Sequence, residues 1–165
     1  MQIVPADMSL LAAFETYVNE CIGSDIDNYE FVFNNYQGFL KKRIAYAQGK
    51  ELPKGWPPMS TFFCLRGDEI LGSIRIRHGH SDYINNVIGH IGYETKPSAR
   101  GQGVAKYMLS WLQNNRLTEN SIITCATTNL ASRKVIESSG ATYLNNFYYV
   151  EENIEVARYQ LSKPN

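Results

Sequence analysis

PSARGQGVA, the stretch at residues 97–105, is the part of this sequence that decides the predicted fold. It separates a predicted strand at His90–Thr95 from a predicted amphipathic helix at Gly103–Arg116. A glycine-containing loop between a strand and a helix can direct backbone N–H groups and a helix N-terminus toward an anion. Glycine also lets a ligand approach the backbone, because no Cβ atom intervenes. Taken alone, the pattern also fits a tight corner between a strand and a helix.

The loop differs from two common phosphate-binding motifs. It lacks the lysine and the hydroxyl residue that end a P-loop, GxxxxGK[ST]. The dinucleotide-binding pattern GxGxxG begins at Gly101 and fails at Lys106. An interpretation of the loop as an anion site therefore needs support from the rest of the chain.

Hydrophobic periodicity on both sides of the loop predicts a mixed α/β fold, in which helices cover both faces of a sheet. In the strand predicted at Ile70–Arg77, Ile74 and Ile76 face one way while Arg75 and Arg77 face the other. In chain order, we predict a helix capped by Asp7, a helix at Tyr29–Gln48 bent near Gly38, a hairpin of strands at Thr61–Arg66 and Ile70–Arg77, a strand at His90–Thr95, a helix at Gly103–Arg116, a strand at Ser121–Ala126, a helix at Asn129–Ser139, and strands at Thr142–Val150 and Ile154–Leu161.

Length and composition indicate one globular domain. The chain has 165 residues, of which 44% are hydrophobic and 19% charged, a composition too apolar for intrinsic disorder. Its 16 basic and 16 acidic residues cancel, whereas nucleic-acid-binding domains usually carry a basic excess. No apolar run is long enough for a membrane helix, and the N-terminus lacks the basic start of a secretory signal. We expect a cytoplasmic protein that binds neither nucleic acid nor membrane.

The cysteines and histidines show no pattern typical of a disulfide or a metal site. The cysteines are odd in number and form no C-x-x-C pair, and no histidine lies at ligand spacing from a cysteine. We therefore predict buried free thiols in a reducing compartment, and no metal. The residues concerned are Cys21, Cys64, Cys125, His78, His80 and His90.

The zero net charge conceals an uneven distribution. Residues 1–40 contain six acids and no Lys or Arg, so residues 41–165 hold all 16 bases and the other ten acids. One interpretation is a solvated acidic helix face. The other is a two-sided molecule, whose acidic side attracts cations and whose basic side attracts anions. The sequence leaves both open.

A second motif supports the interpretation of the loop as an anion site. RGQGVA at residues 100–105 resembles the R/Q-x-x-G-x-G/A loop of the GNAT N-acetyltransferase superfamily. NLAS at residues 129–132, followed by SGA at 139–141, resembles that family's next element, an N-x-A-S start to a helix that ends in glycine. The two motifs lie in the family's order, separated by one predicted helix and one predicted strand. GHIGY at residues 89–93 is similar to one bacterial branch of predicted small acetyltransferases.

The resemblance implies a GNAT fold in a single domain spanning residues 1–165. Residues 1–50 would form the helical acceptor side, and residues 60–150 would form the cofactor-binding core. The mostly antiparallel sheet would splay between His90–Thr95 and Ser121–Ala126, where acetyl-CoA, the co-substrate, would place its pantetheine arm like an added strand. Its pyrophosphate would lie on the N–H groups of the glycine loop. The implied contacts are Tyr93, Thr95, Arg100, Gly101, Gln102, Gly103, Val104, Ala105, Asn129 and Ser132.

The implied reaction is direct acetyl transfer to a primary amine, in a small molecule or a peptide, within a ternary complex. The amine must arrive neutral, so a base has to take up its proton. His90 is one candidate base, and Glu94, on the same strand face, would be the base or would orient His90. The family's usual general acid, a tyrosine four residues before the helix-ending glycine, is replaced here by Ile136. We name Tyr143 as its substitute, with other tyrosines of the same strand as alternatives.

The missing tyrosine keeps a second class of function open. The chain could be a non-catalytic module that binds acyl-CoA, or an acyltransferase that uses another acyl-CoA. Turnover of acetyl-CoA in the presence of amines separates these possibilities from the first. We expect a monomer or a homodimer in either case.

The acids near the N-terminus suggest a contact surface for the acceptor. Asp25, Asp27 and Glu30 flank the break between the first two predicted helices. Acidic groups at the mouth of a site would raise the local concentration of a cationic amine, while also raising its pKa. We therefore predict these three residues as acceptor contacts and a positively charged acceptor. A solvated acidic face predicts no such role.

Overall fold

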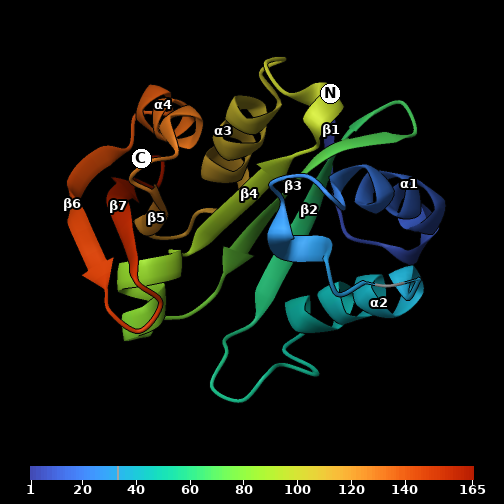
Figure 1. Cartoon of the computed structure of the whole chain (residues 1–165), viewed down its shortest axis with the longest axis horizontal. Coiled ribbons are helices and arrows are strands. Elements are labelled where there is room, and N and C mark those ends of the chain that lie inside the picture. The colour runs from blue at the N-terminus through green and yellow to red at the C-terminus, as the bar shows by residue number, and fades with distance from the viewer. Residues whose placement is uncertain (33) are drawn as a thin grey trace. The chain divides into compact units, whose positions relative to one another are not determined.

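The computed structural model describes residues 1–32 and 34–165, which form two compact units (Figure 1). The first unit comprises Met1–His78 and Tyr93–Val104, and the second comprises Gly79–Gly92 and Ala105–Asn165. The chain therefore leaves the first unit at Gly79, returns to it at Tyr93, and leaves it again at Ala105. Strand β4 (Ile91–Thr95) and helix α3 (Val104–Arg116) contain residues of both units.

The first unit is a sheet with two helices packed against it. Its elements are β1 (Gln2–Pro5), the 3-10 helix η1 (Met8–Leu10), α1 (Leu11–Cys21), the 3-10 helix η2 (Asp27–Tyr29), α2 (Tyr36–Ala47), β2 (Met59–Arg66), β3 (Glu69–Arg77), part of β4, and the 3-10 helix η4 (Pro97–Ala99). The strand order is β1-β2-β3-β4, and the β1–β2 and β2–β3 pairs are antiparallel. α1 and α2 lie beside β2 and β3 (Figure 1).

Aromatic rings form much of the core of the first unit. The ring of Phe14 on α1 stacks on Phe39 of α2, with centroids 5.9 Å apart, and approaches Phe63 of β2 at 5.7 Å. Tyr17 and Tyr29 meet edge to face at 5.6 Å. Such rings bury large apolar areas, and each pair adds about 0.5–1.5 kcal/mol beyond that burial. They join α1, η2 and α2 to the sheet and so fix where the two tyrosine hydroxyl groups point.

The second unit is built from the remaining strands and helices. Its elements are part of β4, the π-helix η3 (Ile84–Ile88), most of α3, β5 (Ser121–Ala126), α4 (Leu130–Ser138), β6 (Thr142–Tyr149) and β7 (Ile154–Leu161). The strand order is β4-β5-β7-β6, with β4 parallel to β5 and the other pairs antiparallel. Met108 and Leu112 of α3 and Ile123 of β5 are fully buried. In the part of the chain that the structure describes, no helix is long and apolar enough to cross a membrane.

Most of the predicted elements, and the mixed, mostly antiparallel sheet, are confirmed. β5 begins and ends where its sequence predicts, and the hairpin turns between Arg66 and Glu69. Asn129 caps α4, because its Oδ1 accepts a hydrogen bond from Ser132 N at 3.0 Å. Gly140 follows α4 with φ of 80°, the left-handed conformation expected after a helix. β4 pairs with β5 at Ile91 and Ile123, and the predicted splay beyond this point stays a prediction.

The second helix was predicted too long. α2 begins at Tyr36, while Asp27–Tyr29 form a separate 3-10 turn. Asn35 is the N-cap of α2, and its Oδ1 accepts from Gly38 N at 3.1 Å. A Cβ atom on Gly38 would lie only 2.5 Å from that oxygen, so this glycine admits the cap and marks no bend. The capping contact, rather than hydrophobic periodicity, sets the start of the helix.

Two elements were missed. β1 is a four-residue strand that pairs with β2, placing Ile3 opposite Cys64, and only this distant partner makes it a strand. No helix was predicted between Arg77 and His90, but the structure has a π-helix at Ile84–Ile88. Its polar residues gave no helical periodicity, whereas Ile84 and Val87 are buried in the structure. Long-range packing therefore decides both elements.

Candidate active site

The loop between β4 and α3 has the backbone shape of an anion site. Gly101 and Gly103 have φ angles of 73° and 78°, in the left-handed region that other residues disfavour. A Cβ atom built on either glycine would meet no heavy atom of the described residues within 4 Å. The backbone conformation therefore requires the glycines, and the space beside them is open.

The N–H groups of this loop can receive a ligand. Within residues 1–32 and 34–165, those of Gly101, Gln102 and Gly103 bond to no acceptor. Val104 is buried, so its side chain anchors the loop and only its backbone can meet a ligand. Successive unbonded N–H groups ahead of a helix form a concave set of donors of the kind that binds phosphate oxygens. The pyrophosphate of acetyl-CoA fits this arrangement.

Side chains beside the loop are held by neighbours in the same unit. Arg100 Nη2 pairs with Asp25 Oδ1 at 2.5 Å, and Arg100 Nε donates to Thr95 O at 3.4 Å. Gln102 Oε1 accepts from Arg66 Nη1 at 3.0 Å. Both members of the Arg100–Asp25 pair are largely exposed, so solvent screens their attraction and the pair opens at little cost. Arg100 would exchange Asp25 for a phosphate if it bound one.

Lys96, the other cation near the loop, is buried and doubly paired. Its Nζ lies 3.0 Å from Glu20 Oε2 and 2.5 Å from Glu69 Oε1. Burial by itself lowers the pKa of Lys96, but the two carboxylates outweigh it and the net pKa is raised. Lys96 therefore joins the end of β4 to α1 and to the start of β3 as a fixed structural charge.

Glu94 of β4 lies at the centre of a buried hydrogen-bond network. Its Oε1 accepts from the hydroxyl groups of Tyr17 at 3.2 Å and Tyr29 at 2.5 Å. Its Oε2 accepts from Arg75 Nη1 at 2.7 Å and Asn28 Nδ2 at 3.2 Å. A carboxylate offers about four lone-pair positions, and these four donors occupy them. Because Glu94 is only 8% exposed, Arg75 supplies the charge that compensates its burial.

Three of the four groups around Glu94 are firmly held as donors. Burial raises the pKa of Tyr17 and of Tyr29 well above 10, and the charge of Glu94 raises both further. Burial lowers the pKa of Arg75, but the charge of Glu94, its hydrogen bond and the two tyrosines together outweigh burial, and the net pKa is raised. The fourth donor, Asn28, is exposed, unlike the other three. Asn28 is therefore the donor that another group can most easily replace.

A cavity of about 310 Å³ in the first unit reaches this network. It lies between α2, the loop at residues 48–58 and the strands β2 and β3. Asn28 and Arg75, two of the donors to Glu94, line it. The other lining residues are Phe39, Lys42, Arg43, Tyr46, Leu52, Pro53, Trp56, Pro57, Met59 and Arg77. A molecule in this cavity can approach Glu94 through Asn28.

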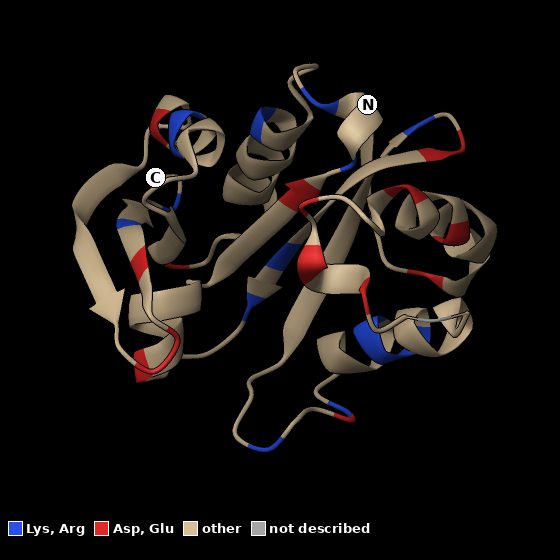
Figure 2. Ribbon diagram, viewed as in Figure 1, with Lys and Arg blue, Asp and Glu red and all other residues tan. Residues whose placement is uncertain are grey.

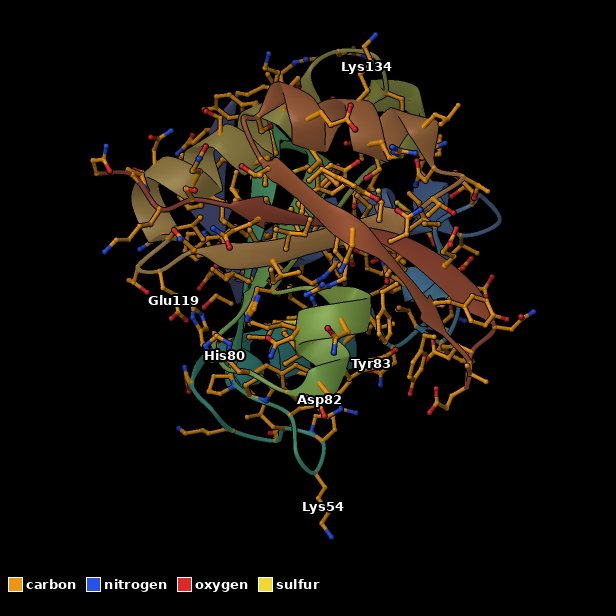
Figure 3. All side chains as sticks on the ribbon, turned by 90° about the vertical axis from the view of Figure 1, so that its left-hand side faces the viewer. Lys54, His80, Asp82, Tyr83, Glu119 and Lys134 are labelled. Atoms are coloured by element: carbon orange, nitrogen blue, oxygen red, sulfur yellow. The ribbon has the colours of Figure 1, made fainter. Side chains whose placement is uncertain are left out.

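In the second unit, His90 belongs to a chain of hydrogen bonds that ends at the surface. Its Nδ1 accepts from Ile122 N at 3.0 Å, so the proton of the neutral ring lies on Nε2. Nε2 faces His80 Nδ1 at 3.1 Å, and His80 Nε2 lies 3.2 Å from Glu119 Oε1. Figure 3 shows the exposed pair His80 and Glu119 at the end of this chain. Both ring nitrogens of His90 are engaged within the second unit.

Tyr143, the predicted general acid, and Ile136, which occupies the position of the family's usual tyrosine, have different environments. Tyr143 of β6 is half exposed, and its hydroxyl donates to Asn146 Oδ1 at 3.0 Å. Its ring meets Tyr159 edge to face at 5.5 Å. Ile136 of α4 is fully buried, so it is part of the core. Tyr143 can present a hydroxyl group to a ligand, and Ile136 cannot act in proton transfer.

A model of the acetyltransferase (GNAT) domain family matches residues 28–142 of the chain. The chain belongs to the GNAT acetyltransferase family. The matched region contains the glycine loop, Glu94 and α4. No curated protein matches this GNAT chain significantly.

Solved structures of GNAT enzymes share the fold of this GNAT chain. The ribosomal-protein-S5-alanine acetyltransferase of Vibrio fischeri has a TM-score of 0.73 and 12% identity, over 99% of this chain and 93% of that one. RimL, a ribosomal L7/L12 alpha-N-protein acetyltransferase in complex with coenzyme A, has a TM-score of 0.68 and 18% identity, over 97% and 92%. The spermidine N-acetyltransferase SpeG of Vibrio cholerae has a TM-score of 0.66 and 11% identity, over 99% and 95%. At these identities the likeness shows the fold alone.

The acids predicted to contact the acceptor of this GNAT chain lie elsewhere in the first unit. Asp25 pairs with Arg100, and this pairing lowers the pKa of the Asp25 carboxyl group. Asp27 begins η2 and Glu30 follows it, and both are exposed. None of the three is among the residues described as lining the cavity. Their contact with an acceptor stays a prediction.

Sequence reasoning missed several residues of the network and the cavity. Tyr17 fitted the apolar face of a helix, and nothing distinguished its hydroxyl group from those of the other ten tyrosines. The alternation in β3 did place Arg75 and Arg77 on one face, opposite Ile74 and Ile76. Because the whole of Ile70–Ile76 is buried, an arginine there needs a carboxylate partner, and that was the available signal.

The cysteines behave as predicted. All three are buried and unbridged, and burial raises the pKa of each, that of Cys21 to about 12. A group of three or more His, Cys, Asp or Glu residues able to hold a metal ion is not found in residues 1–32 and 34–165.

Proposed function

We propose that this chain is an acetyl-CoA-dependent N-acetyltransferase that transfers acetyl to a primary amine, of a small molecule or a peptide, in a ternary complex. The observation that carries the proposal is the loop at Gly101–Gly103, with two left-handed glycines, open space beside them and N–H groups that bond to no acceptor within the described residues. Family membership supports the acetyl transfer. Coenzyme A in the RimL structure supports the choice of donor.

The donor would be held by backbone groups. Its pyrophosphate would accept hydrogen bonds from the N–H groups of Gly101–Ala105, and its pantetheine arm would run along Tyr93–Thr95. The Thr95 hydroxyl group supports this placement, because it is buried and has no hydrogen-bond partner among the described residues. Asn129 Oδ1 already caps α4, which leaves its amide nitrogen for the contact that the resemblance implies. Ser132 in the same helix keeps its predicted role.

The reaction forms one nitrogen–carbon bond and breaks one carbon–sulfur bond. The neutral amine attacks the thioester carbonyl, the nitrogen loses a proton, and coenzyme A leaves as a thiolate that takes up a proton. A backbone N–H near Ile91–Tyr93 would stabilise the oxyanion. Glu94 would take up the amine proton, directly or through a water molecule, after an amine or water in the cavity replaces Asn28 at Oε2.

His90 and Tyr143 remain candidates for the other proton transfers. His90 would act only by giving up its contact with Ile122 N or with His80. Tyr143 is exposed enough to protonate the departing thiolate. The thiolate also leaves without an acid, so Ile136 in the core does not prevent catalysis.

A non-catalytic acyl-CoA-binding module is the second candidate function. The observation in its favour is Ile136, which is buried where the family commonly has a tyrosine. Such a module would bind coenzyme A through the same loop without consuming acetyl-CoA. An acyltransferase that uses another acyl-CoA would bind it through the same loop.

Mass spectrometry of reaction mixtures tests the proposal. The purified protein would be incubated with acetyl-CoA and a panel of primary amines that includes peptides, in parallel with propionyl-CoA and succinyl-CoA. We expect an acetylated amine and one free coenzyme A for each acetyl transferred. Stabilisation of the protein by coenzyme A with no product from any amine would favour the binding module. We further propose a cytoplasmic location and a monomer or homodimer, which fractionation and light scattering test.

A further inference from the structure

We propose that the cavity beside α2 binds the acceptor, and that the acceptor is a primary amine that also carries a carboxylate or phosphate group. The proposal rests on the proposed N-acetyltransferase function and adds the chemical class of its substrate. It also reverses the expectation of a cationic acceptor that the acidic N-terminal residues suggest.

The cavity is lined by four cations and by no acid among the described residues. Lys42 and Arg43 come from α2, and Arg75 and Arg77 come from β3. Figure 2 shows the basic residues on α2, beside the more acidic α1. One lining cation, Arg75, is bonded to the carboxylate of Glu94. Even with Glu94 counted, positive charge exceeds negative charge by three.

The charge on α2 is not neutralised by the protein. Within the part of the chain that the structure describes, no carboxylate lies within ion-pair distance of Lys42 or Arg43. The Arg43 guanidinium lies over the Phe39 ring, 4.7 Å from its centroid, and Nη1 lies 4.0 Å from Met59 Sδ. Burial lowers the pKa of Arg43, and the charge of Arg75 lowers it further. An anion entering the cavity would relieve this repulsion.

Three other cations of the first unit have carboxylate partners, so the excess positive charge on α2 stands out. Lys96 has two carboxylates, Arg100 has Asp25, and Arg75 has Glu94. An arginine without a carboxylate partner in a partly enclosed space can bind a carboxylate or phosphate, because its guanidinium donates two parallel hydrogen bonds. Arg43 is placed to do so at the cavity wall.

The remaining lining fits an apolar or aromatic body. Phe39, Tyr46 and Trp56 contribute rings, and Leu52 and Met59 contribute aliphatic surface. Asn28 and Arg75 mark the end of the cavity that meets Glu94, where the amine would lose its proton. A ligand with an amine at that end and an anion near α2 meets both sets of groups. A polyamine such as spermidine would instead place cations against four cations.

Fluorescence of Trp56 measures binding without relying on activity. The chain has two tryptophans, so a Trp111→Phe protein reports from Trp56 at the cavity wall. The ligands are matched pairs that differ in the anion, phenylalanine with phenylalaninamide and O-phosphoethanolamine with ethanolamine, together with spermidine. We expect the anionic member of at least one pair to bind about tenfold more tightly than its partner, a difference of about 1.4 kcal/mol.

Two adjacent lysines provide a matched control. Lys41 and Lys42 are both exposed on α2, but only Lys42 is among the described lining residues. In the Trp111→Phe background, Lys42→Glu should raise Kd for the anionic ligand about fivefold, while Lys41→Glu should change it less than twofold. Arg43→Gln should raise it by about tenfold. Urea unfolding of each variant identifies any loss of folding.

The outcomes separate this proposal from the proposed function. Tighter binding of phenylalanine alone assigns a carboxylate, and tighter binding of O-phosphoethanolamine alone assigns a phosphate. Equal binding within both pairs, no binding of any anion, preferred binding of spermidine, or equal effects of Lys41→Glu and Lys42→Glu would overturn the anionic acceptor. Acetylation of amines without an anion, in preference to their anionic partners, would overturn it while leaving the N-acetyltransferase intact. Selective anion binding with no acetylated product would support the pocket and reject the enzyme.

Discussion

The two units differ in the charge of their buried polar residues. Among the residues that the structure describes, the three buried charged side chains, Arg75, Glu94 and Lys96, all belong to the first unit. The buried polar side chains of the second unit are His90 and Ser121, whose contacts need no net charge. Removing a charge from water costs several kcal/mol unless a partner compensates it.

We propose that the first unit performs the proton transfer of the proposed reaction. Its buried carboxylate, Glu94, is bonded to two residues that line the cavity, so a ligand that displaces one of them can exchange a proton with it. The histidine chain of the second unit instead leads from Ile122 to an exposed glutamate, and it is engaged at every ring nitrogen. We therefore assign the acceptor chemistry to the first unit and test the assignment by altering one unit at a time.

The largest expected effect is that of Glu94→Gln. The substitution places an amide NH2 among four donors and removes the proposed base, so kcat/KM should fall about 100-fold or more. Glu94→Ala should also lower the free energy of unfolding by about 3–5 kcal/mol, because Arg75 loses its partner. Steady-state kinetics and urea unfolding measure the two effects.

Glu119→Gln, at the exposed end of the histidine chain, is the control and should remain within about twofold of wild type. Comparable losses in both variants would erase the distinction between the units.

The next effect concerns the glycine loop. Gly103→Asp adds a side chain and a negative charge where a phosphate would lie, so coenzyme A should no longer stabilise the protein. For wild type, coenzyme A at 100 times its Kd should add about 2.7 kcal/mol, visible as a rise in Tm. Gly23→Asp is the matched control, since Gly23 has φ of 80° and equally open surroundings among the described residues. If both variants kept the rise in Tm, the loop would not be the phosphate site.

A smaller effect is expected from the ion pair between α1 and the end of β4. Burial raises the pKa of Glu20, but Ser98 N–H and Lys96 outweigh it, so the net pKa is lowered from 4.5. A lowered folded-state pKa means that Glu20 stabilises the protein above pH 4.5 and that this contribution is lost as the pH falls through the folded-state value. Glu20→Gln should therefore be less stable than wild type at pH 7, and the difference should shrink as the pH falls below 4.5.

The Glu20 effect should stay below about 1 kcal/mol, because its side chain is 31% exposed and solvent screens the pair. Urea unfolding at several pH values measures it. Glu15→Gln, on the exposed face of α1, serves as the control for a charge change alone. A pH-independent difference between wild type and Glu20→Gln would show that the pair acts through packing and not through its charge.

The smallest effect is expected at the thiols. Because burial raises the pKa of all three cysteines, treatment of the folded protein with iodoacetamide should modify them slowly and leave activity intact. Cys125 of the second unit is 8% exposed, whereas Cys21 and Cys64 of the first unit are fully buried, so Cys125 should react first. Intact-mass measurements with and without urea test the order. Fast modification of Cys125 with loss of activity would give this cysteine a role that we do not assign.

The prediction from sequence succeeded where a few adjacent residues decide the structure. The glycine loop between β4 and α3, the start of α4 at Asn129 and the turn after Arg66 each depend on the local backbone. β1 was missed because its strand character comes from a partner about sixty residues away. The predicted start of α2 was wrong because the Asn35 side chain caps the helix, and this contact sets where α2 begins. The same limit applied to Arg75, whose partner Glu94 lies on another strand.

The sequence by itself determined the family, the glycine loop and the order of helices and strands, because these depend on spacing and on local backbone preference. Only the tertiary structure decided which charges remain unpaired. The acidic first forty residues suggested a cationic acceptor, yet Glu20 and Asp25 pair with Lys96 and Arg100 from beyond β4. Lys42 and Arg43, which have no carboxylate within ion-pair distance among the described residues, line the cavity instead. Electrostatic attraction acts over a few ångströms in space, whatever the separation along the chain, so a segment's net charge does not reveal the charge of the site that it helps to form.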